Sequence, residues 1–247
     1  MKFHEFGDSD GFPVIFFMGT PQKGDSGDEF SDLASRFGIR LICPTRPWYD
    51  DTSAHSSFDV CSENTIAYLR NNGITSCHAI GGSGGGPFAL HLSTSNPGIV
   101  RSCYLLASMG TPDLFVEKVA SPPTLQLLEF FRGNNYGSTI EYLRSLGLPD
   151  DLAHGAWADF KVLLGSWDSI AFKQAPIVYI HHGEDDENAP IESVRDLATK
   201  LPKTEFRISH HASHAGMAED ESSTEISRIF EEVMLECAPA ANNAITQ

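Results

Sequence analysis

The segment Gly81-Gly82-Ser83-Gly84-Gly85 constrains this chain most, because it joins a strand-like run to a helix-like run through a tight turn. Residues 75–80 before it are typical of a buried strand, and residues 86–92 after it are typical of a helix. A serine on such a turn presents its hydroxyl to solvent, and the crowded backbone around it tolerates little more than glycine. The free N–H groups of the following helix favour an oxyanion there. The pattern predicts a nucleophilic serine, Ser83, although a glycine-rich loop without a catalytic role would match the same sequence pattern.

The C-terminal third of the chain supplies an acid and a base for such a serine. The apolar run 176–180 predicts a buried strand that ends in an acid-rich loop, and residues 204–208 predict a short strand that ends in a histidine-rich loop. Open α/β sheets place their sites at the carboxyl ends of strands. A serine hydroxyl needs a base to remove its proton, and a carboxylate orients that base. The order of these segments predicts a Ser, acid, His triad.

From about residue 12 to residue 230 the chain resembles the α/β-hydrolase superfamily, on the motif around Ser83 and the two loops that follow it. In that family the acid commonly stands three residues after a glycine and four before a proline. The resemblance therefore implies Asp186, which lies between Gly183 and Pro190. Asp185 is the neighbouring alternative, and Asp113 is a second one because some members carry the acid after the preceding strand.

The family histidine usually follows a small residue in the loop after the last strand, which implies His214 after Ser213. His210 and His211 come earlier, at the end of the strand itself. A metal site built from these histidines is not expected, because adjacent residues of a strand point to opposite faces and no H-E-x-x-H pattern is present.

The resemblance also implies an oxyanion hole formed by the backbone N–H groups of Gly84 and Thr20. Thr20 lies in a loop where the family usually has H-G-x-P, and Met18 replaces the histidine here. A backbone donor survives that replacement, although an ordinary glycine turn after a strand is the alternative reading. The later segment around Arg46 resembles the family's arginine-proline loop, in which the arginine is expected to donate to loop carbonyl groups.

The composition fits one enzyme domain that acts on small molecules. The chain has 247 residues, 41% of them hydrophobic, and a formal net charge of −16. Nucleic acid and anionic membranes are therefore not expected partners, since a phosphate backbone needs a positive surface. The N-terminus shows no leader peptide, no apolar run is long enough to span a membrane, and the five cysteines lack metal-ligand spacing. We expect a cytoplasmic protein without cofactor or metal, and the sequence leaves the oligomeric state open.

The expected fold class is α/β, with a mostly parallel twisted sheet and helices on both faces. Predicted strands cover residues 2–6, 13–18, 39–43, 76–80, 101–107, 177–181 and 205–208, and predicted helices cover 28–37, 59–71, 84–95, 191–200 and 221–237. The segment 111–172 contains no predicted strand, and in the resembled family an insertion there is a helical cap. The domain prediction is a hydrolase core of residues 1–110 and 173–237, a cap of 111–172 and a tail of 238–247.

The cap is rich in aromatic residues, which predicts a largely apolar roof over the site: Phe115, Phe130, Phe131, Tyr136, Tyr142, Trp157, Phe160 and Trp167. The leading hypothesis is a serine hydrolase that cleaves small to medium, uncharged carboxylic esters. Two alternatives remain open. The same triad could act on another bond, such as an amide, a thioester, a peracid or the carbon–carbon bond of a diketone, or the protein could be a slow, hydrolase-like binding or signalling protein.

Overall fold

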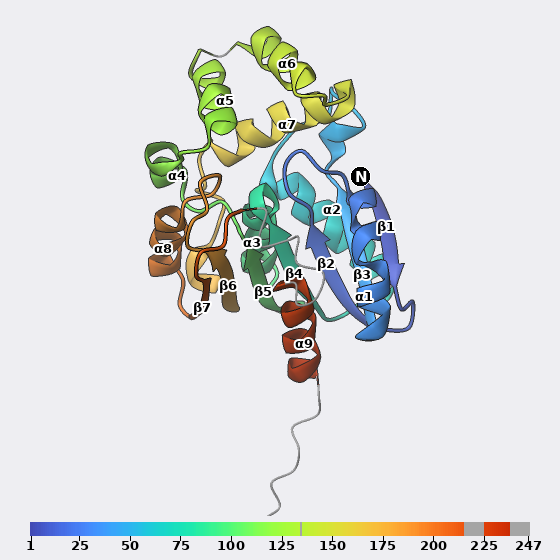
Figure 1. The fold of residues 1–247 in the computed structure, drawn as a ribbon. Helices are drawn as coiled ribbons and strands as arrows, with labels where there is room; N and C mark the ends of the chain where they lie inside the picture. Colours follow the sequence, from blue (N-terminus) through green and yellow to red (C-terminus); the bar gives the residue numbers. More distant parts are fainter. Residues whose placement is uncertain (134, 215–224, 238–247) are drawn as a thin grey trace, which may run out of the picture.

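The computed structural model describes residues 1–133, 135–214 and 225–237, in which seven strands form one sheet (Figure 1). The strands are β1 (Lys2–Gly7), β2 (Phe12–Phe17), β3 (Ile39–Thr45), β4 (Cys77–Gly82), β5 (Val100–Leu106), β6 (Ile177–Gly183) and β7 (Thr204–Ser209). Their order is β1-β3-β2-β4-β5-β6-β7, and only the β1–β3 pair is antiparallel within the described residues. The predicted, mostly parallel sheet is confirmed, and each strand lies within two residues of its predicted bounds.

The described helices are α1 (Ser31–Arg36), α2 (Phe58–Asn71), α3 (Gly86–Ser95), α4 (Pro112–Lys118), α5 (Pro122–Arg132), α6 (Tyr136–Ser145), α7 (Asp150–Leu163), α8 (Ile191–Lys200) and α9 (Glu225–Cys237). The helix predicted over 28–37 is wrong in its first part, because residues Gly24–Phe30 form a 3-10 helix before α1 begins. Gly24 packs so closely on β3 that an added Cβ would lie 2.2 Å from the carbonyl oxygen of Cys43. The predicted start of the last helix, 221–224, lies outside the described residues.

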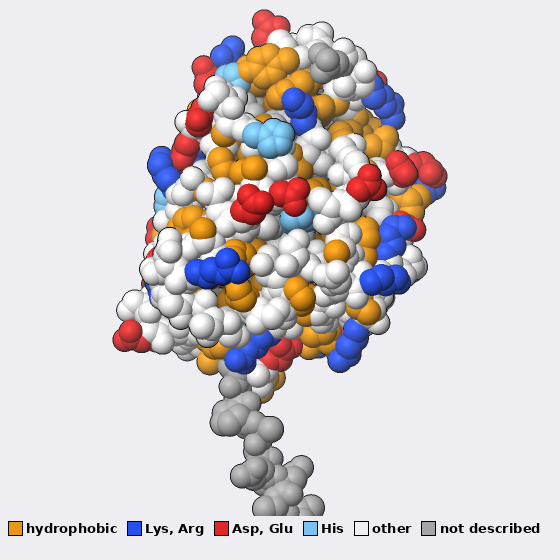
Figure 2. Space-filling view, turned by 180° about the vertical axis from the view of Figure 1, so that it is seen from behind, with side chains coloured by type: hydrophobic (Ala, Val, Ile, Leu, Met, Phe, Trp, Pro, Cys, Tyr) orange, Lys and Arg blue, Asp and Glu red, His pale blue; other side chains and the backbone are white. Residues whose placement is uncertain are grey.

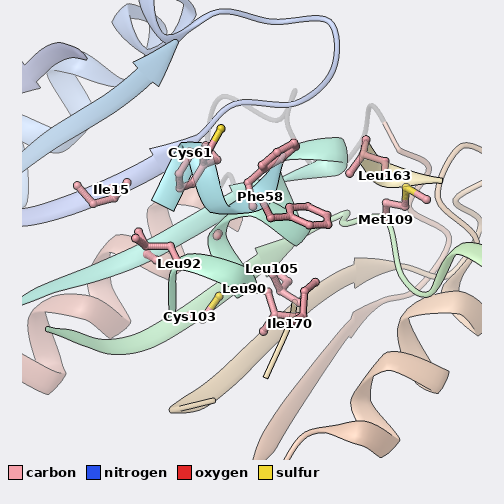
Figure 3. Close-up of a cluster of buried hydrophobic side chains, with 14 of the residues drawn as sticks. Ile15, Phe58, Cys61, Leu90, Leu92, Cys103, Leu105, Met109, Leu163 and Ile170 are labelled. Atoms are coloured by element: carbon pink, nitrogen blue, oxygen red, sulfur yellow. The ribbon is translucent and has the colours of Figure 1, made fainter. Parts of the chain in front are cut away.

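Helices cover both faces of the sheet because side chains alternate along its strands. On β2, Ile15 and Phe17 belong to a buried cluster that includes side chains of α2, α3 and α8, whereas Val14 and Phe16 belong to one that includes side chains of α1 and α9. Figure 3 shows part of the first cluster, in which Leu90 and Leu105 lie near Cys103 between the sheet and the helices. Both β2 faces are therefore core, which is why this strand is a continuous apolar run rather than an alternating one.

Helices α4 to α7, here named the cap segment (Pro112–Leu163), lie above the sheet in Figure 1. Helix α7 packs on the 3-10 turn Pro47–Tyr49, and an added Cβ at Gly155 of α7 would lie 2.1 Å from the ring of Tyr49. Leu163 at the end of α7 joins the main buried cluster of the core. The division of the chain into a core domain and a cap domain stays a prediction.

Four cysteines, Cys43, Cys61, Cys77 and Cys103, are buried free thiols. Burial raises the pKa of the Cys77 and Cys103 thiols to about 12, so both remain uncharged core side chains. No described helix is long and apolar enough to cross a bilayer.

Candidate active site

Ser83 sits at the carboxyl end of β4 on a strained backbone, with a φ of 49°. The 3-10 turn Ser83–Gly85 leads directly into α3. A Cβ at Gly85 would lie 2.1 Å from the carbonyl oxygen of Phe17, and one at Gly81 would lie 2.5 Å from Cα of Gly86, the first residue of α3. Close backbone approach thus requires glycine at positions 81 and 85, in line with the sequence pattern, whereas a Cβ at Gly82 would meet nothing closer than 3.6 Å.

His214 and Asp186 continue from Ser83 as one hydrogen-bonded chain. The Ser83 Oγ lies 3.0 Å from Nε2 of His214, and Nδ1 of His214 lies 2.7 Å from Oδ2 of Asp186. With Nδ1 protonated, His214 donates to Asp186 and accepts from Ser83. The side chain of Asp186 is fully buried, whereas 24% of the His214 side chain is exposed. This arrangement has the geometry of a general base held by a carboxylate beside a nucleophile.

The loop after β6 holds Asp186 in a fixed orientation. Its Oδ1 accepts the backbone N–H groups of Asn188 at 2.9 Å and Ala189 at 2.8 Å. The buried His182 donates from Nε2 to the carbonyl oxygen of Ala189 at 2.6 Å, and burial lowers the pKa of His182, so the ring is neutral. Gly183 lets the histidine-bearing loop approach, since an added Cβ would lie 2.3 Å from the Ala212 carbonyl oxygen.

The alternative acids and histidines take other partners. Asp185 is exposed and lies 3.7 Å from His211, and His210 lies 2.9 Å from Glu184. Asp113 is exposed in the first turn of α4. In the described part of the chain, no hydrogen bond joins any of these side chains to Ser83 or to His214. The structure therefore brings together the three residues that the family pattern implied.

The loop after β2, where the sequence predicted one of the oxyanion donors, lies against the turn Ser83–Gly85. A Cβ added to Gly84 would lie 2.5 Å from Oγ1 of Thr20, and one added to Gly19 would lie 3.3 Å from Cβ of Ser83. Thr20 and Gly84 are thus neighbours beside Ser83. Their role as oxyanion donors stays a prediction.

Arg46 supports this loop from the side of β3. Its guanidinium donates to the carbonyl oxygens of Met18 at 2.7 Å, Gly19 at 3.1 Å and Gln22 at 3.3 Å. The prediction that Arg46 is a donor to loop carbonyl groups is confirmed. The loop with Met18 at the position of the family's histidine is therefore held by arginine hydrogen bonds.

A cavity of about 210 Å³ opens at Ser83 under the cap segment. The core contributes Thr20, Pro21, Ser83, Gly84, Met109, Asn188, Ala189 and His214, and the cap segment contributes Phe115, Thr124, Leu127, Leu143, Ala156, Phe160 and Leu163. None of these lining residues is Lys, Arg, Asp or Glu. Among the residues that the structure describes, no group of three His, Cys, Asp or Glu side chains is arranged to hold a metal ion.

Asp159 of α7 is the main residue that sequence reasoning missed. It is fully buried next to the loop after β2, with Thr20 Oγ1 donating to its Oδ2 at 2.6 Å. A signal was present in the sequence: Asp159 falls on the apolar helical stripe of Ala156, Phe160 and Leu163. A carboxylate on the buried face of a helix indicates a specific partner, because burying an unpaired charge is costly.

Comparison with solved structures places this fold among the α/β-hydrolases. A carboxylesterase from the thaumarchaeon Nitrososphaera gargenis has a TM-score of 0.70 at 14% identity, with 96% of each chain covered. An α/β-hydrolase-fold protein from Nakamurella multipartita has a TM-score of 0.68 at 18% identity, with 95% of each chain covered. The meta-cleavage product hydrolase from Pseudomonas fluorescens has a TM-score of 0.63 at 18% identity and covers 96% of this chain and 94% of its own. No protein-family model and no curated protein sequence matches the chain.

Proposed function

Because the chain has the α/β-hydrolase fold, we propose that it is a serine hydrolase that cleaves small to medium, uncharged carboxylic esters through an acyl-enzyme on Ser83. The observation that carries this proposal is the hydrogen-bonded chain from Ser83 Oγ through His214 to Asp186, with distances of 3.0 and 2.7 Å, at one end of an uncharged cavity. Such a chain gives a serine hydroxyl the base that it needs for attack on a carbonyl carbon.

In the acylation step, Ser83 Oγ attacks the ester carbonyl carbon while Nε2 of His214 takes the hydroxyl proton. Asp186 stabilises the imidazolium that forms, since its buried carboxylate accepts the Nδ1–H at 2.7 Å. The N–H groups of Thr20 and Gly84 would bind the oxyanion. When the tetrahedral intermediate collapses, the bond to the alcohol oxygen breaks and His214 returns the proton to the leaving alcohol.

In the deacylation step, water takes the place of the alcohol. His214 removes a proton from the water as it attacks the acyl carbon, and then returns that proton to Ser83 Oγ as the acid leaves. One ester and one water thus become one acid and one alcohol, and these side chains supply every proton transfer. The substrate is a small molecule, and no cofactor or metal takes part in the proposed steps.

The cavity lining supports an uncharged acyl group as the substrate part that lies under the cap segment. Its walls are largely aliphatic and aromatic, with Leu127 and Phe160 from the cap segment and Met109 from the core. A carboxylate or ammonium group placed there would lose its hydration without gaining an ionic partner among these side chains. The net charge of −16 adds only a weak effect against anionic substrates, because physiological salt limits the reach of exposed charges to about 8 Å.

A second candidate function uses the same triad on the carbon–carbon bond of a diketone. One of the structural neighbours, the meta-cleavage product hydrolase from Pseudomonas fluorescens, supports this candidate. Activity on a diketone without activity on a panel of short nitrophenyl esters would select this candidate. Slow turnover of both kinds of substrate would instead indicate a binding or signalling protein.

The nucleophile provides the direct test of the proposal. A serine-directed phosphonate is expected to form one covalent adduct, located at Ser83 by peptide mass spectrometry. Ser83→Ala is expected to abolish both the adduct and ester turnover, because no other group provides the attacking oxygen. Ser166→Ala, a change in the exposed turn after α7, is a matched control with expected wild-type activity. An adduct on another serine, or full activity of the Ser83→Ala variant, would refute the assignment.

A further inference from the structure

The cap segment buries one carboxylate, Asp159, against the loop that carries the proposed oxyanion donor. Asp159 is fully buried and accepts five hydrogen bonds. These come from Arg46 Nε at 2.7 Å and Trp48 Nε1 at 2.8 Å to Oδ1, and from Arg46 Nη2 at 2.7 Å, Tyr49 Oη at 2.5 Å and Thr20 Oγ1 at 2.6 Å to Oδ2. A two-pronged arginine pair with three further donors is a fully satisfied buried charge, so the carboxylate has one fixed position.

The donors around Asp159 are fixed as well. Burial raises the pKa of Tyr49 well above its usual value, and the nearby Asp159 charge raises it further, so the phenol stays protonated and donates. Gly155, one turn before Asp159 on α7, lies against the ring of Tyr49 with no room for a side chain. Helix α7 therefore meets the core at a close-packed contact that sets where Asp159 sits.

Thr20 is held through its side chain and through the peptide group that precedes it. Its hydroxyl donates to Asp159 at 2.6 Å, and the carbonyl group of the preceding peptide, that of Gly19, accepts from Arg46 at 3.1 Å. The Gly19–Thr20 peptide bond is trans, and the N–H of a trans peptide points away from its C=O. Holding the Gly19 oxygen towards Arg46 thus fixes the direction of the Thr20 N–H, and Gly19 itself packs on Ser83.

We infer that Asp159 is a positioning residue for the oxyanion hole, through which the cap segment sets the orientation of the Thr20 N–H. This inference rests on the proposed acyl-enzyme chemistry, since an oxyanion forms only when Ser83 Oγ attacks a carbonyl carbon or a phosphonyl phosphorus. Oxyanion stabilisation depends on donors that are already in place. The cap segment thereby contributes to the rate of the chemical step as well as to the walls of the cavity.

A purely structural role for Asp159 predicts a different outcome. In that case its loss would lower the stability of the fold and leave the rate constants of the folded protein unchanged. Another cap–core ion pair offers the matched comparison. Asp151, also on α7, pairs at the surface with the side chain of Lys23, three residues after Thr20, and makes no hydrogen bond to Thr20 or Gly84 among the described residues. Asp151→Asn is therefore expected to leave the rate constants at the wild-type level.

The test measures the rate constant for phosphonylation of Ser83, together with kcat and KM for p-nitrophenyl butyrate, in four variants. Thr20→Val removes the hydroxyl, keeps the branched shape and the backbone N–H, and leaves the Arg46–Asp159 pair intact. It is expected to lower kcat and the phosphonylation rate about 10-fold with KM within about twofold, and Thr20→Ser is expected to restore most of the loss. Asp159→Asn is expected to lower both rates roughly 100-fold. The fourth variant is the control, Asp151→Asn.

The outcomes separate this inference from the proposed function. If wild-type Ser83 is not phosphonylated, the proposed function fails and this inference fails with it. If wild-type Ser83 reacts while Thr20→Val and a folded Asp159→Asn keep wild-type rates, the positioning role alone is wrong. Melting temperatures show whether Asp159→Asn is folded. If it is not, the rates of Thr20→Val and the recovery in Thr20→Ser decide the question.

Discussion

At the scale of single residues, hydrogen bonds fix the orientation of the Asp186 carboxylate. One oxygen accepts two backbone N–H groups, those of Asn188 and Ala189, and the other accepts His214. Both carboxylate oxygens thus accept hydrogen bonds, and the side chain is fully buried. The carboxylate therefore orients the histidine ring and selects the tautomer with a proton on Nδ1.

Replacing Asp186 by asparagine is expected to lower kcat about 10⁴-fold, because the amide places an N–H where His214 needs an acceptor and favours the wrong tautomer. Asp185→Asn and Asp113→Asn are matched controls, since both carboxylates are exposed and neither is bonded to the histidine. Each control should change kcat/KM for p-nitrophenyl butyrate by less than about threefold. A larger loss of activity in either control than in Asp186→Asn would assign the acid of the triad to the aspartate replaced in that control.

Sequence reasoning singled out Ser83, His214 and Asp186, which the structure brings together, because each is marked by its immediate neighbours, such as the glycines around Ser83 and Gly183 before the acid. Asp159 has no such local mark. Its partners Thr20 and Arg46 lie more than a hundred residues away along the chain, and only the packing of α7 brings them together. A residue whose role depends on partners far away along the chain cannot be identified from the pattern of a single sequence.

At the scale of elements, α9 packs on the sheet through a mixture of apolar and ionisable side chains. Ile226, Ile229, Phe230 and Val233 form its apolar face. Two buried histidines of the sheet lie beside its glutamates: His181 of β6 lies 3.1 Å from Glu225, and His78 of β4 lies 3.6 Å from Glu236. Burial lowers the pKa of His78 to about 4, although the Glu236 charge partly opposes that shift.

We expect the free energy of unfolding to fall as the pH drops from 7 to 5, partly through His78. Its folded-state pKa is below the unfolded value, so the unfolded state binds more protons in this window, and stability is present above about pH 6.5 and lost below it. The His78 contribution is about 2 kcal/mol between pH 7 and 5. Urea unfolding at both pH values checks it in the wild type and in His78→Asn.

The comparison uses the pH difference within each protein, so any destabilisation of His78→Asn at pH 7 does not matter. The variant should lose about 2 kcal/mol less than the wild type between the two pH values. An equal loss in both proteins would assign the acid sensitivity elsewhere. His91 and His182 are the next candidates, since burial lowers the pKa of both.

The strands were predictable because those of a covered parallel sheet are apolar on both faces, as in Val14–Phe17. The first helix was predicted less well. Its residues 24–30 are fixed by contact with β3 rather than by their own helical preference, since both Gly24 and Gly27 pack on Cys43. Local pattern therefore predicted which elements form, and tertiary packing decided where this helix begins.

At the scale of the whole molecule, the formal net charge of the chain is −16. Figure 2 shows Asp and Glu side chains distributed among Lys, Arg and apolar side chains on one face. Exposed charges act over about 8 Å at physiological salt, so they have little effect on a substrate held under the cap segment. Selectivity should instead follow the shape of the cavity at Ser83.

The cavity volume predicts the preferred acyl chain. A cavity of about 150 Å³ can hold one benzene ring, so the 210 Å³ beside Ser83 should hold an acyl chain of about four to eight carbon atoms. Within that range each added methylene should favour binding by up to about 0.8 kcal/mol, and longer chains should be disfavoured by overpacking.

The measurement is kcat/KM for nitrophenyl esters from two to sixteen acyl carbon atoms. The maximum is expected within the range of about four to eight carbon atoms. A cavity variant sharpens the test. Leu143→Ala enlarges the lining from the cap side, at a position without a hydrogen bond to the triad among the described residues, and should shift the maximum towards longer chains. A maximum at sixteen carbon atoms in the wild type would mean that the acyl group lies in an open groove. The enclosed acyl site under the cap segment would then be wrong, because a chain of that length exceeds what 210 Å³ can hold.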